Sequence, residues 1–159
     1  MAKNQEVLHE DSVLAHRQLV KKLNKQLANW NILYTKLHNY HWFVSGSLFF
    51  SLHEKFEELY DEAAVNIDEI AERILTIEAN PIATLKAYLD AASLNEALGN
   101  EKPEDMVRSV TEDFSIMIQE AKETIELAEK NEDDVTADMF TEIKASLEKH
   151  NWMLKAYLK

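Results

Sequence analysis

Only two glycines and two prolines interrupt the 159 residues of this chain, and this scarcity constrains the fold more than any other feature. A sandwich or barrel of short strands needs many turns, and turns depend on glycine and proline. Long helices joined by few connections are the economical alternative. The chain also lacks cysteine, which excludes a disulfide framework and a thiolate metal site. The sequence therefore predicts an all-α protein.

Apolar residues recur every three or four positions through four long segments, the spacing of one face of an amphipathic helix. The predicted helices run from about residue 13 to Phe43, from Ser51 to Glu78, from Pro103 to Lys130, and from the Asp133–Asp134 pair to Leu158. A short amphipathic stretch over residues 81–92 lies in the long connection between the second and third helices. Such a crossover in a four-helix bundle is the ferritin-like topology. We expect one ferritin-like four-helix bundle domain over residues 13–159, with that short extra helix, after a polar tail over residues 1–12 that holds at most a short helix.

Acidic residues outnumber basic ones by 29 to 17, for a formal net charge of −12. A surface of this charge attracts cations and repels phosphate backbones. The tail is not basic either, although a lysine cluster (Lys21, Lys22 and Lys25) lies near the start of the first predicted helix. No apolar run reaches the roughly 18 residues of a membrane span, and no signal-peptide pattern is present. We expect a cytoplasmic protein with weak or absent DNA binding and no membrane association.

Two pairs of potential metal ligands lie on the second predicted helix: His53 with Glu57, and Asp68 with Glu72. The members of each pair are four residues apart, so they share one side of the helix and can reach a common ion. The two pairs point within roughly 20° of each other but lie about 16 Å apart along the axis, at about 1.5 Å per residue. One ion cannot bridge that distance, so each pair alone is a half-site.

The two pairs share a midpoint, because positions 53 and 72 and positions 57 and 68 are both centred between Glu62 and Ala63. If two copies of this helix pack antiparallel about a two-fold axis at that midpoint, each pair faces the complementary pair of the other copy. Ala63 and Ala64 then lie at the axis, where small side chains permit close approach. His41, at the end of the first predicted helix, completes the set from the same chain as His53.

Two imidazoles and three carboxylates form a mixed nitrogen and oxygen ligand set, which suits iron, manganese or zinc and is poor for copper(I). Three carboxylates favour the higher charge of Fe³⁺, as an iron-oxidising site requires. Spacing alone leaves open an alternative, since acidic pairs four residues apart are common on the solvated faces of helices in acidic proteins.

The segment KLHNYHWFVSGSLFFSLHEKFEELYDEAAVNIDEIAERIL resembles the signature of the Dps family, the miniferritins. The matching pieces are His41-Trp42, His53 within LHEKFEELY, and Asp68 and Glu72 within DEIAER. The closing stretches DDVTADM and KHNWMLKAYL resemble that family as well. The resemblance covers about residues 19–159 and leaves the tail uncovered.

This resemblance implies a hollow dodecamer with ferroxidase sites shared across two-fold interfaces. Such proteins oxidise Fe²⁺, preferably with hydrogen peroxide, and store ferric mineral inside, which protects DNA from oxidative damage. By position, His41, His53 and Glu57 come from one subunit, and Asp68 and Glu72 from its partner. Many members have aspartate where Glu57 stands, so the longer side chain puts the second of two iron positions in question.

A second resemblance concerns iron entry, because family members line three-fold pores with acidic side chains. The matching positions are Glu129, Asp134 and Asp138, with glutamate replacing a frequent aspartate at the first of them. Helix capping and loop solvation around NEDD explain the same residues equally well.

The other histidines and tryptophans have structural interpretations. His38 lies one turn before His41, and a surface or interface role is the simpler expectation for it. Trp42 is placed to donate an electron at the site, although a large indole at a helix end usually packs. His150 lies in the apolar stripe of the last helix and is expected to pack there.

Three classes of function therefore remain: an iron-oxidising storage cage, an architectural nucleic-acid protein of the nucleoid, and a helical adaptor without metal. The ordered motifs favour the cage, and the acidic charge disfavours the nucleic-acid protein.

Overall fold

Five helices make up this computed structural model, which describes the backbone of residues 2–159 and the side chains of residues 13–159. No strand occurs in that range, so the all-α prediction is confirmed. The helices are α1 (Ala2–Phe43), α2 (Phe49–Thr76), α3 (Leu85–Ala91), α4 (Pro103–Lys130) and α5 (Asp134–Tyr157).

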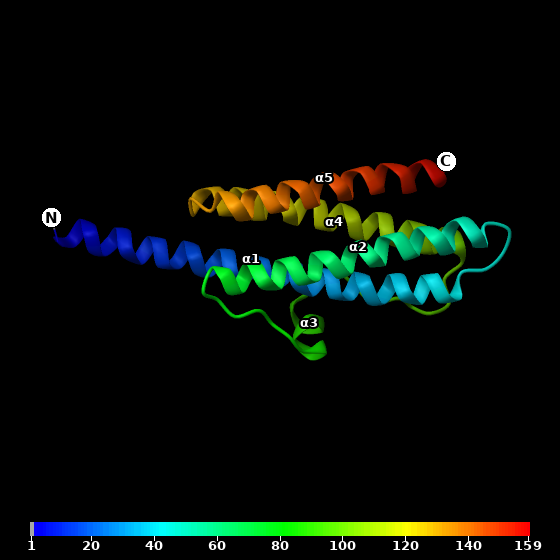
Figure 1. Cartoon of the computed structure of the whole chain (residues 1–159), viewed down its shortest axis with the longest axis horizontal. Coiled ribbons are helices and arrows are strands. Elements are labelled where there is room, and N and C mark those ends of the chain that lie inside the picture. The colour runs from blue at the N-terminus through cyan, green and yellow to red at the C-terminus, as the bar shows by residue number, and fades with distance from the viewer. Residues whose placement is uncertain (1) are drawn as a thin grey trace.

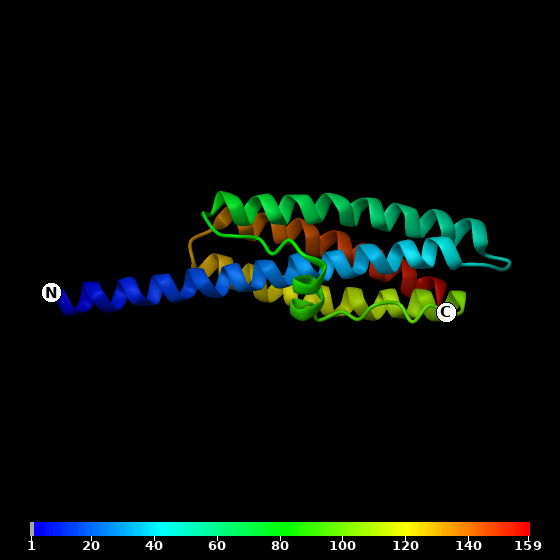
Figure 2. The ribbon, with the colours of Figure 1, turned by 90° about the horizontal axis from the view of Figure 1, so that it is seen from below.

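The four long helices lie side by side as a bundle, and α3 lies outside it against α1 (Figures 1 and 2). The most extensive contacts join α1 to α2 and α4 to α5. The chain crosses the bundle between α2 and α4, which confirms the predicted topology with a short helix in the crossover. Within the described range, no helix is both long and apolar enough to traverse a lipid bilayer.

The predicted apolar stripes form the core. The large side chains that are almost fully buried include Leu23, Trp30, Phe56, Phe114 and Phe140, so every long helix contributes. Full burial of one such side chain stabilises the fold by about 1.5–3 kcal/mol. Burial of these stripes holds the bundle together.

Local signals place most helix ends. α1 ends at Phe43, directly before a turn in which Gly46 adopts a φ of 98° that favours glycine. Pro103 occupies the first turn of α4, as predicted, and the Asp133 side chain caps α5 by accepting a hydrogen bond from the Thr136 N–H at 3.0 Å. The second helix begins and ends two residues earlier than predicted.

The helix α1 begins at Ala2 and extends beyond the bundle (Figure 1). The sequence predicts a polar tail over residues 1–12 with at most a short helix, whereas the backbone of residues 2–12 continues α1. Those residues contain no glycine or proline to end a helix. Met1 lies outside the described residues, and the division into a tail and a bundle domain stays a prediction.

The crossover is fastened to the bundle by the buried carboxylate of Glu120 on α4. It accepts hydrogen bonds from the Asn29 amide on α1 at 2.7 Å and from the Ser93 hydroxyl of the crossover at 2.5 Å. The Ser93 backbone N–H in turn donates to the Asn29 side-chain oxygen at 2.7 Å. Lys25 pairs with the same carboxylate at 2.8 Å and offsets its charge. Burying this carboxylate is tolerable because it is fully hydrogen-bonded.

Polar side chains link α2 to α5 at two places. Near the middle of α2, Glu62 accepts hydrogen bonds from the Ser146 hydroxyl at 2.5 Å and from His150 Nε2 at 2.7 Å. Burial alone raises the pKa of Glu62, but these two bonds together with the nearby charge of Lys55 outweigh it and hold the pKa below its ordinary value. Near the end of α2, Arg73 donates to Asp133 at 2.5 Å and to Thr136 at 2.9 Å. His150 is buried, as its place in the apolar stripe predicts.

Candidate metal centre

Three of the five predicted ligands meet where α1 turns into α2. The ligand atoms of His41, His53 and Glu57 all lie within 4.8 Å of one another. Among residues 13–159, no other group of three or more histidine or acidic side chains converges in this way. The sequence prediction that His41 joins His53 and Glu57 from the same chain agrees with this geometry.

The two histidines orient each other through the backbone. His41 Nδ1 lies 2.8 Å from the carbonyl oxygen of His53, and His53 Nδ1 lies 2.8 Å from the carbonyl oxygen of His41. A carbonyl oxygen only accepts, so each Nδ1 must carry the proton. The rings stack with their centroids 3.7 Å apart and an interplanar angle of 19°. In the neutral tautomer that these bonds select, Nε2 of each ring is unprotonated and available to a metal ion.

Exposure increases across the cluster, from the buried His41 through the half-buried His53 to the exposed Glu57. The imidazoles are thus fixed by packing and backbone hydrogen bonds, while the carboxylate can adjust to an incoming cation. Such a half-site offers two nitrogen ligands and one oxygen ligand and leaves further coordination positions open.

Aromatic rings surround the two imidazoles. Phe49 stacks on His53 with centroids 4.9 Å apart, and Tyr60 meets His41 edge-on at 5.3 Å. Tyr60 also stacks on His38 at 3.9 Å. Partial burial, together with the nearby charge of Glu57, raises the pKa of Tyr60, so its phenol is protonated at neutral pH.

Tyr60 is absent from the ligand set that the sequence predicts. A signal for it exists, because residue 60 lies one helical turn beyond Glu57 and two turns beyond His53 on the same side of α2. A tyrosine this close to predicted core positions is most simply interpreted as a packing residue. The sequence alone therefore does not predict its contact with His41.

Asp68 and Glu72 do not join the cluster. Both are exposed on α2, on a stripe that also carries the exposed apolar side chains of Val65 and Leu75, which are 55% and 56% accessible. The spacing of the sequence predicts this separation within one straight helix. The facing carboxylates of a second copy remain a prediction.

One expectation about the two-fold axis is wrong. Ala63 is fully buried in the core of its own chain, so of the two adjacent alanines only Ala64 lies on the exposed side of α2. The reason is that Ala63 continues the core stripe of Phe56, Leu59 and Ile70.

The predicted pore acids lie around the turn between α4 and α5. Glu129, Asp134 and Asp138 are all exposed there. Asp133 takes the capping role and pairs with Arg73, so capping does not account for Asp134. Burial alone would raise the pKa of Asp133, but hydrogen bonds from Thr136 and the charge of Arg73 outweigh burial and lower that pKa. A pore role for the three exposed acids stays a prediction.

Comparison with known proteins agrees with this architecture. A family model described as a ferritin-like domain matches residues 20–159. The crystal structure of a Dps protein from Bacillus brevis superposes with a TM-score of 0.90 at 51% identity, covering 91% of this chain and 97% of the other. General stress protein 20U of Bacillus subtilis (strain 168) is 55% identical over 141 residues, 89% of this chain and 97% of that protein. DNA protection during starvation protein 2 of Bacillus anthracis is 50% identical over 143 residues, 90% and 98% of the two chains.

These matches show that the molecule is a ferritin-like helical-bundle protein. Within that class, the chain belongs to the Dps family, whose members are named for DNA protection during starvation. The resemblance seen in the sequence motifs is therefore confirmed.

Proposed function

We propose that this chain is a ferroxidase and iron-storage protein. It oxidises Fe²⁺ with hydrogen peroxide at sites shared between two subunits and stores the ferric product in a hollow cytoplasmic dodecamer. The observation that carries the proposal is the preorganised half-site of His41, His53 and Glu57, in a Dps-family chain whose remaining candidate ligands are exposed on the same helix.

The geometry fits iron as the substrate. Two Nε2 atoms and a carboxylate bind Fe²⁺, and the partner's Asp68 and the partner's Glu72 add negative charge that favours Fe³⁺. The overall reaction, 2 Fe²⁺ + H₂O₂ + 2 H₂O → 2 FeOOH + 4 H⁺, consumes both reactants from which hydroxyl radicals form. This chemistry accounts for the protection of DNA without contact with it.

Iron binding is supported at the family level. A related Dps of Vibrio cholerae, 36% identical with a TM-score of 0.88, is described as a member of a superfamily of ferritin-like diiron-carboxylate proteins. In a closed shell, the exposed acids Glu129, Asp134 and Asp138 would line the route by which cations enter. A negative potential along such a route raises the local cation concentration.

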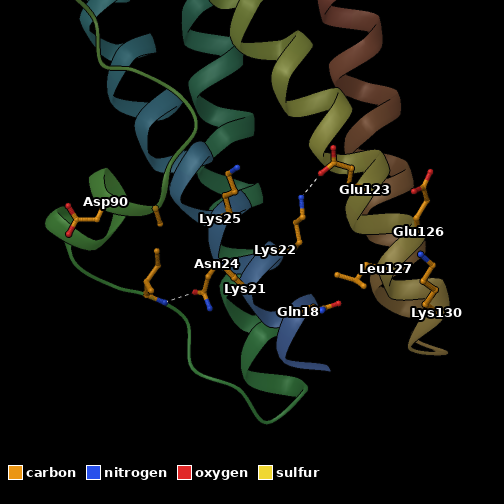
Figure 3. Close-up of a pocket in the computed structure, with 12 residues that line it drawn as sticks. Gln18, Lys21, Lys22, Asn24, Lys25, Asp90, Glu123, Glu126, Leu127 and Lys130 are labelled. Atoms are coloured by element: carbon orange, nitrogen blue, oxygen red, sulfur yellow. Dashed lines mark hydrogen bonds and ion pairs between the residues drawn. The ribbon is translucent and has the colours of Figure 1, made fainter. Parts of the chain in front are cut away.

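Strong binding to DNA is disfavoured by the surroundings of the lysine cluster. Lys22 forms an ion pair with Glu123, and Lys25 pairs with Glu120. Figure 3 shows Lys21, Lys22 and Lys25 together with the acidic side chains of Asp90, Glu123 and Glu126. All six residues line one hollow of about 840 Å³. We propose that duplex DNA binds weakly or not at all, and a gel shift that persists at about 150 mM salt would contradict this.

The proposed function is tested by particle mass combined with anaerobic Fe²⁺ titration and then peroxide addition. We expect a particle of about 220 kDa, twelve times the chain mass of 18.4 kDa. Fe²⁺ should bind at the shared sites and disappear on peroxide addition. A monomer in solution, or Fe²⁺ that peroxide oxidises no faster than in buffer, would overturn the proposal.

A further inference from the structure

Peroxide presents an electron-counting problem to any site that holds a single iron. Reduction of H₂O₂ to water takes two electrons, and one Fe²⁺ supplies only one. Unless a second donor is close, the other product is a hydroxyl radical. The described chain brings only three ligands together, His41, His53 and Glu57, which suffice to hold one Fe²⁺, so a second donor would matter in this chain.

Tyr60 is the oxidisable side chain in contact with the cluster. Its ring meets His41 at a centroid distance of 5.3 Å and an angle of 88°, and stacks on His38 at 3.9 Å and 22°. Tyr60 is half-buried, so its ring is partly shielded from solvent. The aromatic residue that stacks on the other imidazole ligand, His53, is Phe49, whose ring is far harder to oxidise than a phenol.

Two other oxidisable rings are further removed. Tyr34 approaches Tyr60 at 6.2 Å and His38 at 4.4 Å, and Trp42 meets His38 at 5.2 Å. Neither ring is stacked on or edge-on to His41 or His53. The Trp42 side chain is also 66% exposed, so a radical there would meet solvent directly.

Resting on the proposed iron oxidation, we propose that Tyr60 is a redox-active residue that supplies the second electron when peroxide meets a site holding one Fe²⁺. The step is Fe²⁺ + Tyr60–OH + H₂O₂ + H⁺ → Fe³⁺ + Tyr60–O• + 2 H₂O. The O–O bond breaks, and the phenolic proton and one solvent proton end in water. Iron and the phenol each lose one electron.

The next Fe²⁺ restores the residue: Fe²⁺ + Tyr60–O• + H⁺ → Fe³⁺ + Tyr60–OH. The two steps together oxidise two Fe²⁺ per peroxide, which is the stoichiometry of the proposed function. Tyr60 thus allows a site that binds one iron at a time to complete a two-electron reduction without releasing a hydroxyl radical.

The test uses assembled shells loaded anaerobically with one Fe²⁺ per site, mixed with one equivalent of peroxide and frozen for electron paramagnetic resonance. A parallel sample contains a spin trap for hydroxyl radical. The variants are Tyr60→Phe and, as a matched control with the same loss of a hydroxyl, Tyr34→Phe. The Tyr60 hydroxyl makes no hydrogen bond to another described residue, so its removal leaves the packing in place.

We expect a tyrosyl radical in the unmodified protein and in Tyr34→Phe. Tyr60→Phe should lose that signal and at least double the trapped hydroxyl radical. Ring-deuterated tyrosine in the unmodified protein should narrow the signal, which identifies a tyrosine without any variant. An unchanged signal in Tyr60→Phe, a radical that tyrosine deuteration does not alter, or no radical at all would overturn the inference. If the unmodified shell fails to oxidise Fe²⁺ with peroxide, the proposed function fails instead.

Discussion

The two halves of α2 carry the candidate ligands in different states. In the first half, His53 is half-buried, and its ring is hydrogen-bonded to the backbone of α1 and stacked on the His41 ring. In the second half, Asp68 and Glu72 are exposed, on a stripe shared with exposed apolar side chains. The first half contributes to a cluster of three potential ligands within one chain. Among the described residues, no third ligand joins Asp68 and Glu72 in the second half.

Under the proposed function, this difference allows one helix to serve two sites. Imidazoles must be held in the correct tautomer and orientation, and the α1–α2 turn provides this locally. A carboxylate is well solvated and needs no fixed tautomer, so under the same proposal Asp68 and Glu72 can remain exposed in one chain until a second copy covers them.

Replacing a ligand in either half should abolish activity to the same extent. We expect His53→Ala and Asp68→Ala each to slow peroxide-dependent Fe²⁺ oxidation at least about 100-fold, since even residues that only support a ligand contribute about 10–100-fold. Stopped-flow absorbance measures this rate. Glu69→Ala, an exposed neighbour of Asp68, is the control and should retain the rate. If Asp68→Ala oxidised Fe²⁺ at the normal rate, the second half of α2 would not contribute to the site, and the comparison would be wrong.

The second half of α2 depends on Arg73 for its attachment to α5. Arg73→Leu should lower the free energy of unfolding by about 2 kcal/mol, because it removes charge-assisted hydrogen bonds to Asp133 and Thr136. Urea denaturation measures the change. Lys86→Ala removes an ion pair with Asp90 that is exposed on both sides and should cost under about 0.5 kcal/mol. Equal losses for the two variants would refute the anchoring role of Arg73.

The length of the Glu57 side chain should control occupancy of the first half-site. We expect Glu57→Asp to change Fe²⁺ affinity by no more than about tenfold and to raise the number of Fe²⁺ ions bound per site. Anaerobic calorimetric titration reports both quantities. Glu54→Asp, an exposed position one turn earlier, is the matched control. An unchanged stoichiometry in Glu57→Asp would show that the extra methylene does not limit the second ion.

The contribution of Asp133 to the free energy of unfolding should depend on pH. Its pKa is lowered in the folded protein, so its contribution is present above its unfolded pKa of about 3.9 and is lost as the pH falls through the lower folded value. Asp133→Asn should therefore show a shallower loss of unfolding free energy below about pH 4 than the unmodified protein. Denaturation at a series of pH values tests this smallest effect, and parallel curves for the two proteins would count against it.

Much of the architecture follows from local pattern. The apolar period predicts all four long helices, and Pro103 and Asp133 mark two of their starts because capping depends on a few adjacent residues. The convergence of His41 on His53 is also predictable, since a short turn brings those two helix ends together.

Contacts between helices are less predictable. These contacts depend on how each helix is rotated against its neighbour. Examples are the pairing of Arg73 with Asp133, the pairing of Glu62 with His150 and the stacking of Tyr60 on His38. Spacing along one helix does not fix that rotation. Ala63 is the exception, because its place in the apolar stripe already assigns it to the core rather than to the two-fold axis.

Complementation between inactive chains tests the shared centre most directly. Equal amounts of His53→Ala and Asp68→Ala chains are unfolded, mixed and reassembled, and mass spectrometry verifies shells that contain both. With random pairing, half of the dimers are mixed, and each mixed dimer carries one intact site and one doubly altered site. We therefore predict that up to a quarter of the sites regain peroxide-dependent Fe²⁺ oxidation. Verified mixed shells without any recovery would contradict the account.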